Sequence, residues 1–226
     1  MSRILAFGDI HGCSKALDTL LELVAPQDDD TLIFLGDYID RGPDSRGVLQ
    51  RLAELSQRPN FVALLGNHDL WMLRARTDRK WFRSWIGLGV GGLDTLESYG
   101  ASNFEDIPEA HWKFLESTRN FYETERFIFA HASIEGHLPL ENMSEEVLLW
   151  RRVTESKPHY SEKTLICGHT SQSSGVPLDL GHAICIDTHA YSANGWLSCL
   201  EPTSLYLWQA NQDGDTRHGW LGDFVL

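Results

Sequence analysis

Short apolar runs rich in β-branched and aromatic residues recur through the chain, and each has the length of a strand. They cover residues 4–7, 32–35, 61–65, 127–130, 165–167, 183–186, 196–200 and 205–208. The runs end in Gly, Asp, His or another turn residue. We therefore expect about eight strands, with the last two, 196–200 and 205–208, forming a pair.

Helical spacing fills the gaps between the first three runs. Apolar residues separated by three, one and three positions form one helix face at Leu17, Leu20, Leu21 and Val24. A second such face consists of Val48, Leu52 and Leu55. The opening third therefore reads β-α-β-α-β, which predicts a parallel sheet with helical crossovers.

The residue composition changes between residues 70 and 125, where Trp, Arg and Leu are frequent and four glycines interrupt helical segments. We interpret this stretch as a helical insertion and expect its tryptophans, at positions 71, 81, 85 and 112, to lie in the core. The C-terminal third returns to strands and favours a second sheet with antiparallel members. The predicted fold class is an α/β sandwich of two mixed β-sheets flanked by helices, with residues 1–226 as a single domain.

Composition and charge narrow the function. The chain has 226 residues, of which 42% are hydrophobic, enough to bury a substantial core. The net charge of −13 argues against binding a nucleic acid duplex, and any anionic substrate would need local cations. No apolar run approaches the roughly 20 residues of a membrane helix, and no signal peptide pattern opens the chain, so we expect a cytoplasmic protein without membrane contact. Four scattered cysteines argue against a zinc ribbon or a disulfide framework.

Polar residues follow each of the first three strands. The segments are Gly8-Asp9-Ile10-His11-Gly12, Gly36-Asp37-Tyr38-Ile39-Asp40-Arg41-Gly42 and Gly66-Asn67-His68-Asp69. Because the carboxyl ends of parallel strands lie side by side, these loops should converge at one edge of the sheet. Two later strands also end at histidines, His131 and His169.

The residue types at these strand ends indicate metal binding. Several carboxylates at one point cannot all stay ionised without cations between them. Carboxylate and amide oxygens combined with imidazole suit Mn, Fe or Zn better than calcium. Six candidate ligands are too many for one ion with an open position, but they suit two ions that share one carboxylate.

These three motifs, followed by the two histidines, resemble those of the PPP-type metallophosphatases in the calcineurin-like superfamily. The likeness is closest to compact bacterial and phage-lambda-type serine/threonine phosphatases and to diadenosine tetraphosphate hydrolases, and it covers essentially the whole chain. Further motifs stand in the expected order: Gly91-Gly92-Leu93-Asp94-Thr95-Leu96, Trp150-Arg151-Arg152, Gly168-His169-Thr170 and Ile186-Asp187-Thr188.

The resemblance implies a role for each matching residue. Asp9 and His11 would hold one metal, Asn67, His131 and His169 the other, and Asp37 would bridge them. His68, oriented by Asp40, would protonate the leaving oxygen, and Arg41 and Arg152 would bind phosphate oxygens. Arg151 remains an alternative to Arg152, and His189 stands where the family pattern has Gly. The two divalent ions would be manganese first, with iron or zinc as alternatives.

The implied activity is hydrolysis of phosphate esters by direct attack of a metal-bridging hydroxide, without a phosphoenzyme. We expect phosphoserine or phosphothreonine in proteins as the substrate, or a phosphorylated small molecule, with the enzyme acting as a monomer. One alternative is hydrolysis of dinucleoside polyphosphates such as diadenosine tetraphosphate, or of nucleotide-capped RNA ends. Another, of a different class, is an inactive phosphate-binding scaffold, although no expected ligand is missing. A nuclease or cyclic-nucleotide phosphodiesterase fits less well, because Gly168-His169 is not followed by a second His.

Overall fold

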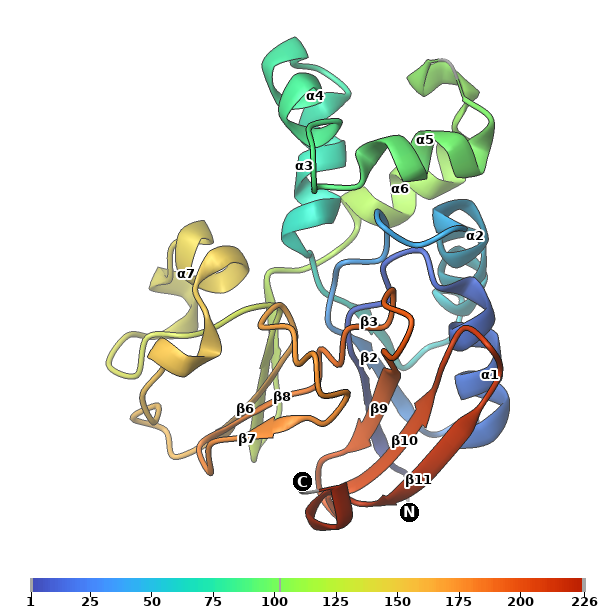
Figure 1. Cartoon of the computed structure of the whole chain (residues 1–226). Helices are drawn as coiled ribbons and strands as arrows, with labels where there is room; N and C mark the ends of the chain where they lie inside the picture. Colours follow the sequence, from blue (N-terminus) through green and yellow to red (C-terminus); the bar gives the residue numbers. More distant parts are fainter. Residues whose placement is uncertain (1, 102, 225–226) are drawn as a thin grey trace.

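Two mixed β-sheets lie against each other in the computed structural model, which describes residues 2–101 and 103–224 (Figure 1). The strand order is β11-β10-β9-β1-β2-β3 in the first sheet and β4-β5-β6-β8-β7 in the second. Helices cover the outer face of each sheet (Figure 1). The expected α/β sandwich of two mixed sheets flanked by helices is confirmed.

The first sheet combines a parallel and an antiparallel half. Its parallel strands are β1 (Ile4–Phe7), β2 (Thr31–Phe34) and β3 (Phe61–Ala63). They are joined by α1 (Ser14–Val24) and α2 (Ser45–Leu55). Its antiparallel strands are β9 (Leu197–Glu201), β10 (Tyr206–Ala210) and β11 (Thr216–Trp220). The β-α-β-α-β reading of the opening third is thus confirmed.

The second sheet has a parallel centre and antiparallel edges. The central strands are β5 (Phe127–Ala130), β6 (Thr164–Cys167) and β8 (Ala183–Cys185). The edge strands are β4 (Phe121–Glu123) and β7 (Leu178–Asp179). Helix α7 (Glu145–Trp150) lies between β5 and β6 in sequence and packs on the outer face. Short 3₁₀ turns are η1 (Phe104–Asp106), η2 (Leu140–Asn142), η3 (Val153–Glu155) and η4 (Leu221–Phe224).

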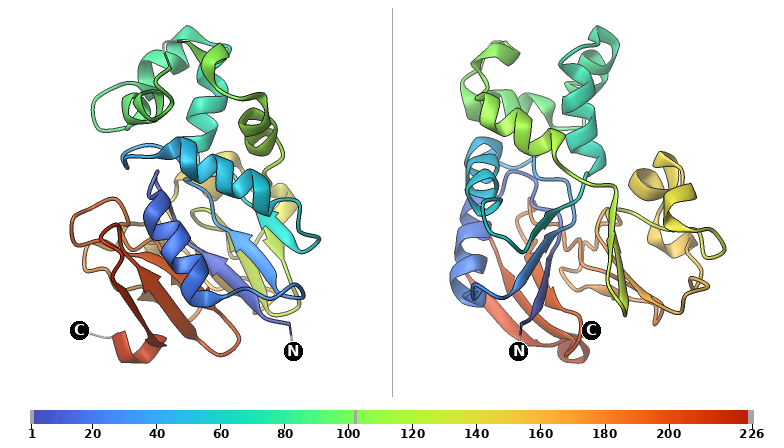
Figure 2. Two further views of the ribbon diagram at one scale, coloured as in Figure 1. Left: turned by 90° about the vertical axis from the view of Figure 1, so that its right-hand side faces the viewer. Right: turned by 180° about the vertical axis from the view of Figure 1, so that it is seen from behind.

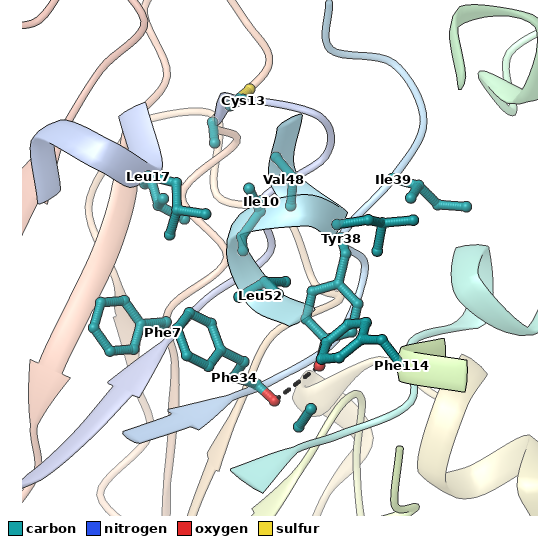
Figure 3. Packing of buried hydrophobic residues seen from close by; sticks show 14 of the residues in the cluster. Phe7, Ile10, Cys13, Leu17, Phe34, Tyr38, Ile39, Val48, Leu52 and Phe114 are labelled. Carbon is teal, nitrogen blue, oxygen red and sulfur yellow. Dashed lines mark hydrogen bonds between the residues drawn. The ribbon is translucent and has the colours of Figure 1, made fainter. Parts of the chain in front are cut away.

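Side-chain alternation along the central strands divides the core into layers. Leu5 and Phe7 of β1 point into the cluster under α1 and α2, whereas Ala6 points into the cluster between the two sheets. Figure 3 shows the first of these clusters, where Phe7 stacks on Phe34 with ring centroids 4.5 Å apart. Because successive residues of a strand face opposite sides, a continuous apolar run is what a strand covered on both faces requires.

The C-terminal strands differ from the expectation in one respect. The strand pair at 196–200 and 205–208 is present, but it extends the first sheet instead of the second. Strand β9 pairs antiparallel with β1, with Ala6 opposite Leu200 and Phe7 opposite Cys199. An apolar run indicates that a strand is buried, but it carries no information about which strand pairs with it. The pairing of β9 with β1 therefore could not be predicted from the run itself.

Four helices gather above the carboxyl ends of the parallel strands (Figure 2). They are α3 (Asn67–Ala75), α4 (Arg79–Trp85), α5 (Gly92–Tyr99) and α6 (Glu109–Glu116). The helical insertion predicted at about 70–125 therefore begins slightly earlier and ends before β4. Trp85 and Trp112 are buried as expected, whereas Trp71 and Trp81 are half-buried. None of the helices in the described ranges is long and apolar enough to span a membrane.

Candidate active site

Backbone hydrogen bonds join the loops that follow β1 and β2. The carbonyl oxygen of Asp37 accepts a bond from the amide of His11 at 2.9 Å, and that of Tyr38 accepts one from Gly12 at 2.9 Å. These bonds join the two loops and hold Asp37 and His11 at the same end of the sheet.

Asp69 attaches the third loop to the second. It lies in the first turn of α3, and its carboxylate accepts bonds from the amides of Gly66 (3.0 Å), Asp37 (2.8 Å) and Tyr38 (3.1 Å). The carboxylate is fully buried, so these charge-assisted bonds form away from water, where they are strongest. Asp69 thereby fixes the position of Asp37 without belonging to the candidate ligand set.

Left-handed backbone conformations concentrate at these loops. Nine non-glycine residues in the described part of the chain have positive φ, and six of them lie at the candidate site. They are His11 (47°), Asp37 (53°), Asp40 (73°), Arg41 (71°), His169 (61°) and His189 (62°). Each such residue costs of the order of 1 kcal/mol or more, and such strain persists where the surrounding structure imposes it, commonly at functional sites.

Three imidazoles are oriented by backbone carbonyl oxygens. The acceptors are Ile39 for His11 Nδ1 (2.9 Å), Leu35 for His131 Nδ1 (2.9 Å) and Trp150 for His169 Nε2 (3.0 Å). In a neutral imidazole the nitrogen facing a carbonyl carries the proton, so the other nitrogen carries the lone pair. This is the arrangement of metal-ligating histidines, whose second nitrogen is held by a hydrogen bond.

Asp37 lies between the histidines of the two sheets. One carboxylate oxygen is 3.6 Å from His11 Nε2, and the other is 3.4 Å from His131 Nε2. Two groups of potential ligands share Asp37, and within each group the ligand atoms lie within 4.8 Å of one another. The groups are His11, Asp37 and His68, and Asp37, His131 and His169. This geometry suits a carboxylate that bridges two cations.

Asn67 completes the second group. Its Oδ1 lies 2.9 Å from His131 Nε2 and 3.0 Å from His169 Nδ1, the two nitrogens that retain lone pairs. Three acceptor atoms that face one another repel unless a cation lies among them. The donor set of amide oxygen, carboxylate and two imidazole nitrogens therefore fits a divalent transition metal.

Asp9 lies outside both groups but shows the same need for a cation. Its Oδ1 is buried and has no hydrogen-bond partner among the described residues, while its Oδ2 accepts a bond from the amide of His169 at 3.0 Å. A Cβ at Gly168 would lie 1.8 Å from Asp9 Oδ1, so only glycine permits this approach. A buried carboxylate oxygen without a donor is costly, and a metal ion would satisfy it.

Burial and charge set the protonation of these groups. Burial raises the pKa of the Asp37 carboxyl, but the surrounding imidazoles, led by His131, outweigh burial and hold it well below its usual range. Burial lowers the pKa of His131 to about 4 and also lowers that of His11 and His169, so these rings are neutral at pH 7. Neutral imidazole and ionised carboxylate are the forms that bind metal.

Several carboxyls around Asp37 show the opposite shift, among them Asp9 and Asp187. Burial, reinforced by the charges of Asp187 and Asp37, raises the pKa of Asp9 well above its usual range. Burial likewise raises the pKa of Asp187 to about 6, against the lowering effect of the hydrogen bond from the amide of His189. Like charges at short range cannot all ionise without a cation.

The His68 and Asp40 side chains form a buried pair beside this centre. His68 Nδ1 is 2.7 Å from Asp40 Oδ2, which leaves Nε2 as the nitrogen that Asp40 does not engage. The Asp40 carboxylate also accepts bonds from Trp85 Nε1 (2.9 Å) and from Thr95 Oγ1 (2.6 Å). Both additional donors belong to the helical insertion, so the insertion completes the pair.

The candidate phosphate-binding arginines differ in their surroundings. Arg41 Nη1 lies 3.0 Å from His11 Nε2, at the edge of the first group. Arg151 forms an ion pair with Glu135. Arg152 is exposed and takes part in no ion pair between described residues, so it is the freer of the two neighbouring arginines.

The sequence motifs by themselves assign no role to Asp187, Trp85 or Thr95. Asp187 could have been recognised as a site residue from the sequence, because it follows the apolar run at 183–186 much as Asp9 follows the first strand. Thr95 lies in a motif quoted for the resemblance, but its bond to Asp40 crosses 55 residues of sequence. No local signal marks Trp85, which resembles any other tryptophan of a helical core.

Comparison with known proteins places this geometry in a family. The calcineurin-like phosphoesterase family matches residues 2–185. A symmetrical bis(5'-nucleosyl)-tetraphosphatase of Legionella pneumophila (strain Lens) is 35% identical over 150 residues, which are 63% of this chain and 47% of that protein. One from Burkholderia mallei (strain SAVP1) is 45% identical over 69 residues, which are 30% of this chain and 24% of that protein. The chain thus spans between a quarter and a half of the length of these curated relatives.

Solved structures share the fold. A protein provisionally assigned as a diadenosine tetraphosphatase superposes with a TM-score of 0.67 at 24% identity, covering 97% of this chain and 94% of the other. A serine/threonine phosphatase of Saccharomyces cerevisiae superposes with a TM-score of 0.60 at 15% identity, covering 89% and 73%. At these identities the likeness concerns the fold alone. With the family match over most of its length, the chain belongs to the calcineurin-like phosphoesterase family of metal-dependent hydrolases.

Proposed function

We propose that the chain is a single catalytic domain, residues 1–226, that uses two divalent metal ions to hydrolyse dinucleoside tetraphosphates symmetrically into two nucleoside diphosphates. The observation that carries the catalytic part is the position of Asp37. Its two carboxylate oxygens face imidazoles from different sheets, His11 on one side and His131 on the other. Manganese is the first candidate metal, and iron or zinc would find the same ligands.

The resemblance to the metallophosphatases implies the ligand roles, and the lone pairs described above support them. Asp9 and His11 would hold one ion and Asn67, His131 and His169 the other, with Asp37 shared. When bound, the two ions would supply an activated water as nucleophile and would neutralise charge on the reacting phosphoryl group. The protein contributes a rigid frame for them, since each imidazole is fixed by a backbone carbonyl.

His68 would donate a proton to the leaving oxygen. The buried Asp40 holds its Nδ1 at 2.7 Å and so fixes the ring with Nε2 available. Arg41 and Arg152 would bind phosphate oxygens, which carry charge that guanidinium groups match well. No nucleophilic side chain is required, so phosphate transfer would proceed directly to water without a phosphoenzyme.

The substrate assignment reverses the order given by the sequence motifs, which favoured phosphoserine or phosphothreonine in proteins. The reason is the similarity to symmetrical bis(5'-nucleosyl)-tetraphosphatases, which at 35% identity extends over 63% of this chain. Structural likeness to a serine/threonine phosphatase concerns the fold alone. Phosphoprotein hydrolysis therefore remains the second candidate, and a single assay separates the two.

The test compares two substrates on the manganese-loaded protein. Diadenosine tetraphosphate and a phosphothreonine peptide are each assayed for kcat/KM, with the Asp37→Asn protein as the blank. The proposal expects the dinucleotide to give the larger value and ADP to be the sole nucleotide product. Release of AMP and ATP would contradict symmetrical cleavage, and a larger kcat/KM on the peptide would establish the second candidate instead.

A further inference from the structure

A row of six rings crosses the candidate site. In order, the rings are those of Trp150, Trp71, His68, His11, Tyr191 and His189. The centroids of successive rings are 5.3, 5.4, 4.8, 5.1 and 4.5 Å apart. The two central imidazoles have assigned roles in the site described above, whereas none of the outer four side chains is an assigned metal ligand, phosphate-binding group or member of the His68–Asp40 pair.

The outer rings come from separate parts of the fold. Trp71 lies on α3, Trp150 ends α7, and His189 and Tyr191 lie in the loop that follows β8. Among the described residues, no ring contact joins the tryptophan pair to the Tyr191–His189 pair except through the two central imidazoles. The outer pairs therefore flank the site, one on each side.

Core packing accounts for only part of the surface of these side chains, although Trp71 and Tyr191 pack against the cluster under α1 and α2, and Trp150 packs against the core of the second sheet. All four are half-buried. In the described part of the chain, neither the Nε1 of Trp71 and Trp150, nor the Tyr191 hydroxyl, nor the ring nitrogens of His189 form a hydrogen bond within the protein. Trp85 shows the contrast, because it is fully buried and its Nε1 is bonded to Asp40. Half-exposed rings with unpaired polar edges are suited to a ligand that is both flat and polar.

We propose that the Trp71–Trp150 pair and the Tyr191–His189 pair each stack one nucleobase of a dinucleoside polyphosphate. The inference rests on the proposed function and assigns its substrate-binding surfaces. Cleavage at the midpoint of a symmetrical molecule leaves equal halves of the substrate on either side of the reacting phosphorus, and the ring row offers an aromatic surface on either side. Every base has a π face, so such surfaces would accept different nucleosides.

Charge gives the stacking surfaces a further purpose. With a net charge of −13, the protein repels a polyphosphate at long range, so affinity must come from local cations and from contacts outside the phosphates. The Arg41 guanidinium lies 4.9 Å from the centroid of the Tyr191 ring. It thus adjoins both the phosphate position and one base-stacking surface, and a nucleotide half would contact both.

The test compares substrates with and without bases on the same variants. Manganese-loaded protein is assayed with diadenosine tetraphosphate and with inorganic tripolyphosphate. The readout is the ratio of their kcat/KM values, in which any loss common to both substrates cancels. Trp71→Leu and Tyr191→Leu should each lower this ratio roughly 5- to 150-fold, the effect of losing one stacked base. The matched controls Trp71→Phe and Tyr191→Phe keep an aromatic face and should retain most of the ratio.

His189 permits a ring deletion that leaves the backbone undisturbed. Its φ of 62° is one that glycine adopts freely, so His189→Gly removes the imidazole without opposing the local conformation. We expect a smaller fall of the same ratio than in Tyr191→Leu. Product inhibition provides a second measurement, since ADP should inhibit the wild type more strongly than pyrophosphate does, and the leucine variants should reduce that difference.

The outcomes separate this inference from the proposed function. If the wild type cleaves diadenosine tetraphosphate while both leucine variants keep the wild-type ratio and the wild-type difference between ADP and pyrophosphate, the stacking surfaces are refuted and the activity stands. If the wild type prefers the phosphothreonine peptide, the proposed function itself fails, and the inference falls with it.

Discussion

At the residue scale, the candidate centre depends on side chains whose free atoms are determined by backbone partners. The carbonyl oxygens of Ile39 and Leu35 accept from Nδ1 of His11 and His131, and each bond leaves Nε2 for a metal. His169 is reversed, with Nε2 bonded to the Trp150 carbonyl and Nδ1 directed at Asn67. Because the partners are backbone groups, the tautomers follow from the fold and resist substitution of neighbouring side chains.

Replacing His68 tests its place in the mechanism. His68→Asn removes the proton donor but keeps a polar side chain, so kcat on a phosphothreonine peptide, whose leaving alkoxide needs a proton, should fall on the order of 10²–10⁴-fold. Metal content measured by elemental analysis should stay at the wild-type value. Unchanged turnover on the peptide would remove His68 from the mechanism, and loss of metal would show that it acts as a ligand.

The shifted carboxyls predict how metal affinity depends on pH. Burial raises the pKa of Asp187 to about 6 and that of Asp9 well above its usual range, so that below pH 7 these carboxyls increasingly hold protons that a cation must displace. Binding therefore releases protons, and affinity should weaken as the pH falls from 7 to 5. His131 contributes little in this range, because burial lowers its pKa to about 4.

Calorimetric titration with Mn in buffers of different ionisation enthalpy measures the number of protons released. Asp187→Asn keeps an oxygen for the bond from the His189 amide, which is 3.0 Å long in the native protein. This variant should release fewer protons at pH 6 and show a flatter pH dependence. If the number of protons released is the same as in the wild type, metal binding does not change the protonation of Asp187.

At the scale of single elements, the helical insertion reaches into the catalytic pair. Trp85 closes α4 and Thr95 lies on α5, and both donate hydrogen bonds to the Asp40 carboxylate. Asp40 is fully buried, so it depends on these donors and on His68 to remain ionised. Burial nevertheless raises its pKa, which these three bonds partly counteract.

Thr95→Val removes one donor while conserving shape. Loss of a bond to a buried charge is worth about 1.5–3 kcal/mol, so kcat on the phosphothreonine peptide should fall roughly 10- to 100-fold if the bond acts through His68. Hydrolysis of p-nitrophenyl phosphate, whose leaving group needs no proton, should fall much less. Thr95→Ser retains the hydroxyl and serves as the control. Equal losses on both substrates would indicate a general disturbance of the site instead of a role in orienting His68.

At the scale of the whole molecule, the centre lies where the two sheets meet. Asp9, His11, Asp37 and Asn67 follow strands of the first sheet, and His131 and His169 follow strands of the second. Bound cations would therefore tie the sheets together at this end. The core between the sheets holds them together elsewhere, with Ala6 and Ile33 from one side and Phe129 and Ile166 from the other.

Removing metal should consequently lower the thermal stability of the entire chain. A ligand present at 100 times its Kd stabilises the native state by about 2.7 kcal/mol. For a chain of this size each kcal/mol corresponds to about 2–4 °C, so chelation should lower Tm by roughly 5–10 °C. Asp37→Asn, which removes the shared ligand, should bind neither ion and show no shift with chelator. Full metal occupancy in that variant would refute the bridge.

Much of the architecture could be predicted from local sequence patterns. Runs such as residues 4–7 and 32–35 are apolar on both strand faces, and the structure places them between helices and a second sheet. The grouping of the strand-end segments could be predicted for a related reason, because neighbouring parallel strands place their carboxyl ends at the same edge of a sheet. That geometry brings together the loops within each sheet, whereas the convergence of Asp37 with His131 and His169 within 4.8 Å depends on the packing of the two sheets.

Other features depended on contacts between residues far apart in sequence. No periodic sequence pattern signals three of these contacts. They are the pairing of β9 with β1, the hydrogen bond from Trp85 to Asp40 and the ring contact between His11 and Tyr191. The order of residues therefore specified the elements and the chemical groups at their ends, because these follow from local spacing and burial. Only tertiary packing decided which groups meet, which nitrogen of each imidazole is free and which carboxyl keeps its proton, because these properties arise from neighbours that the chain brings together when it folds.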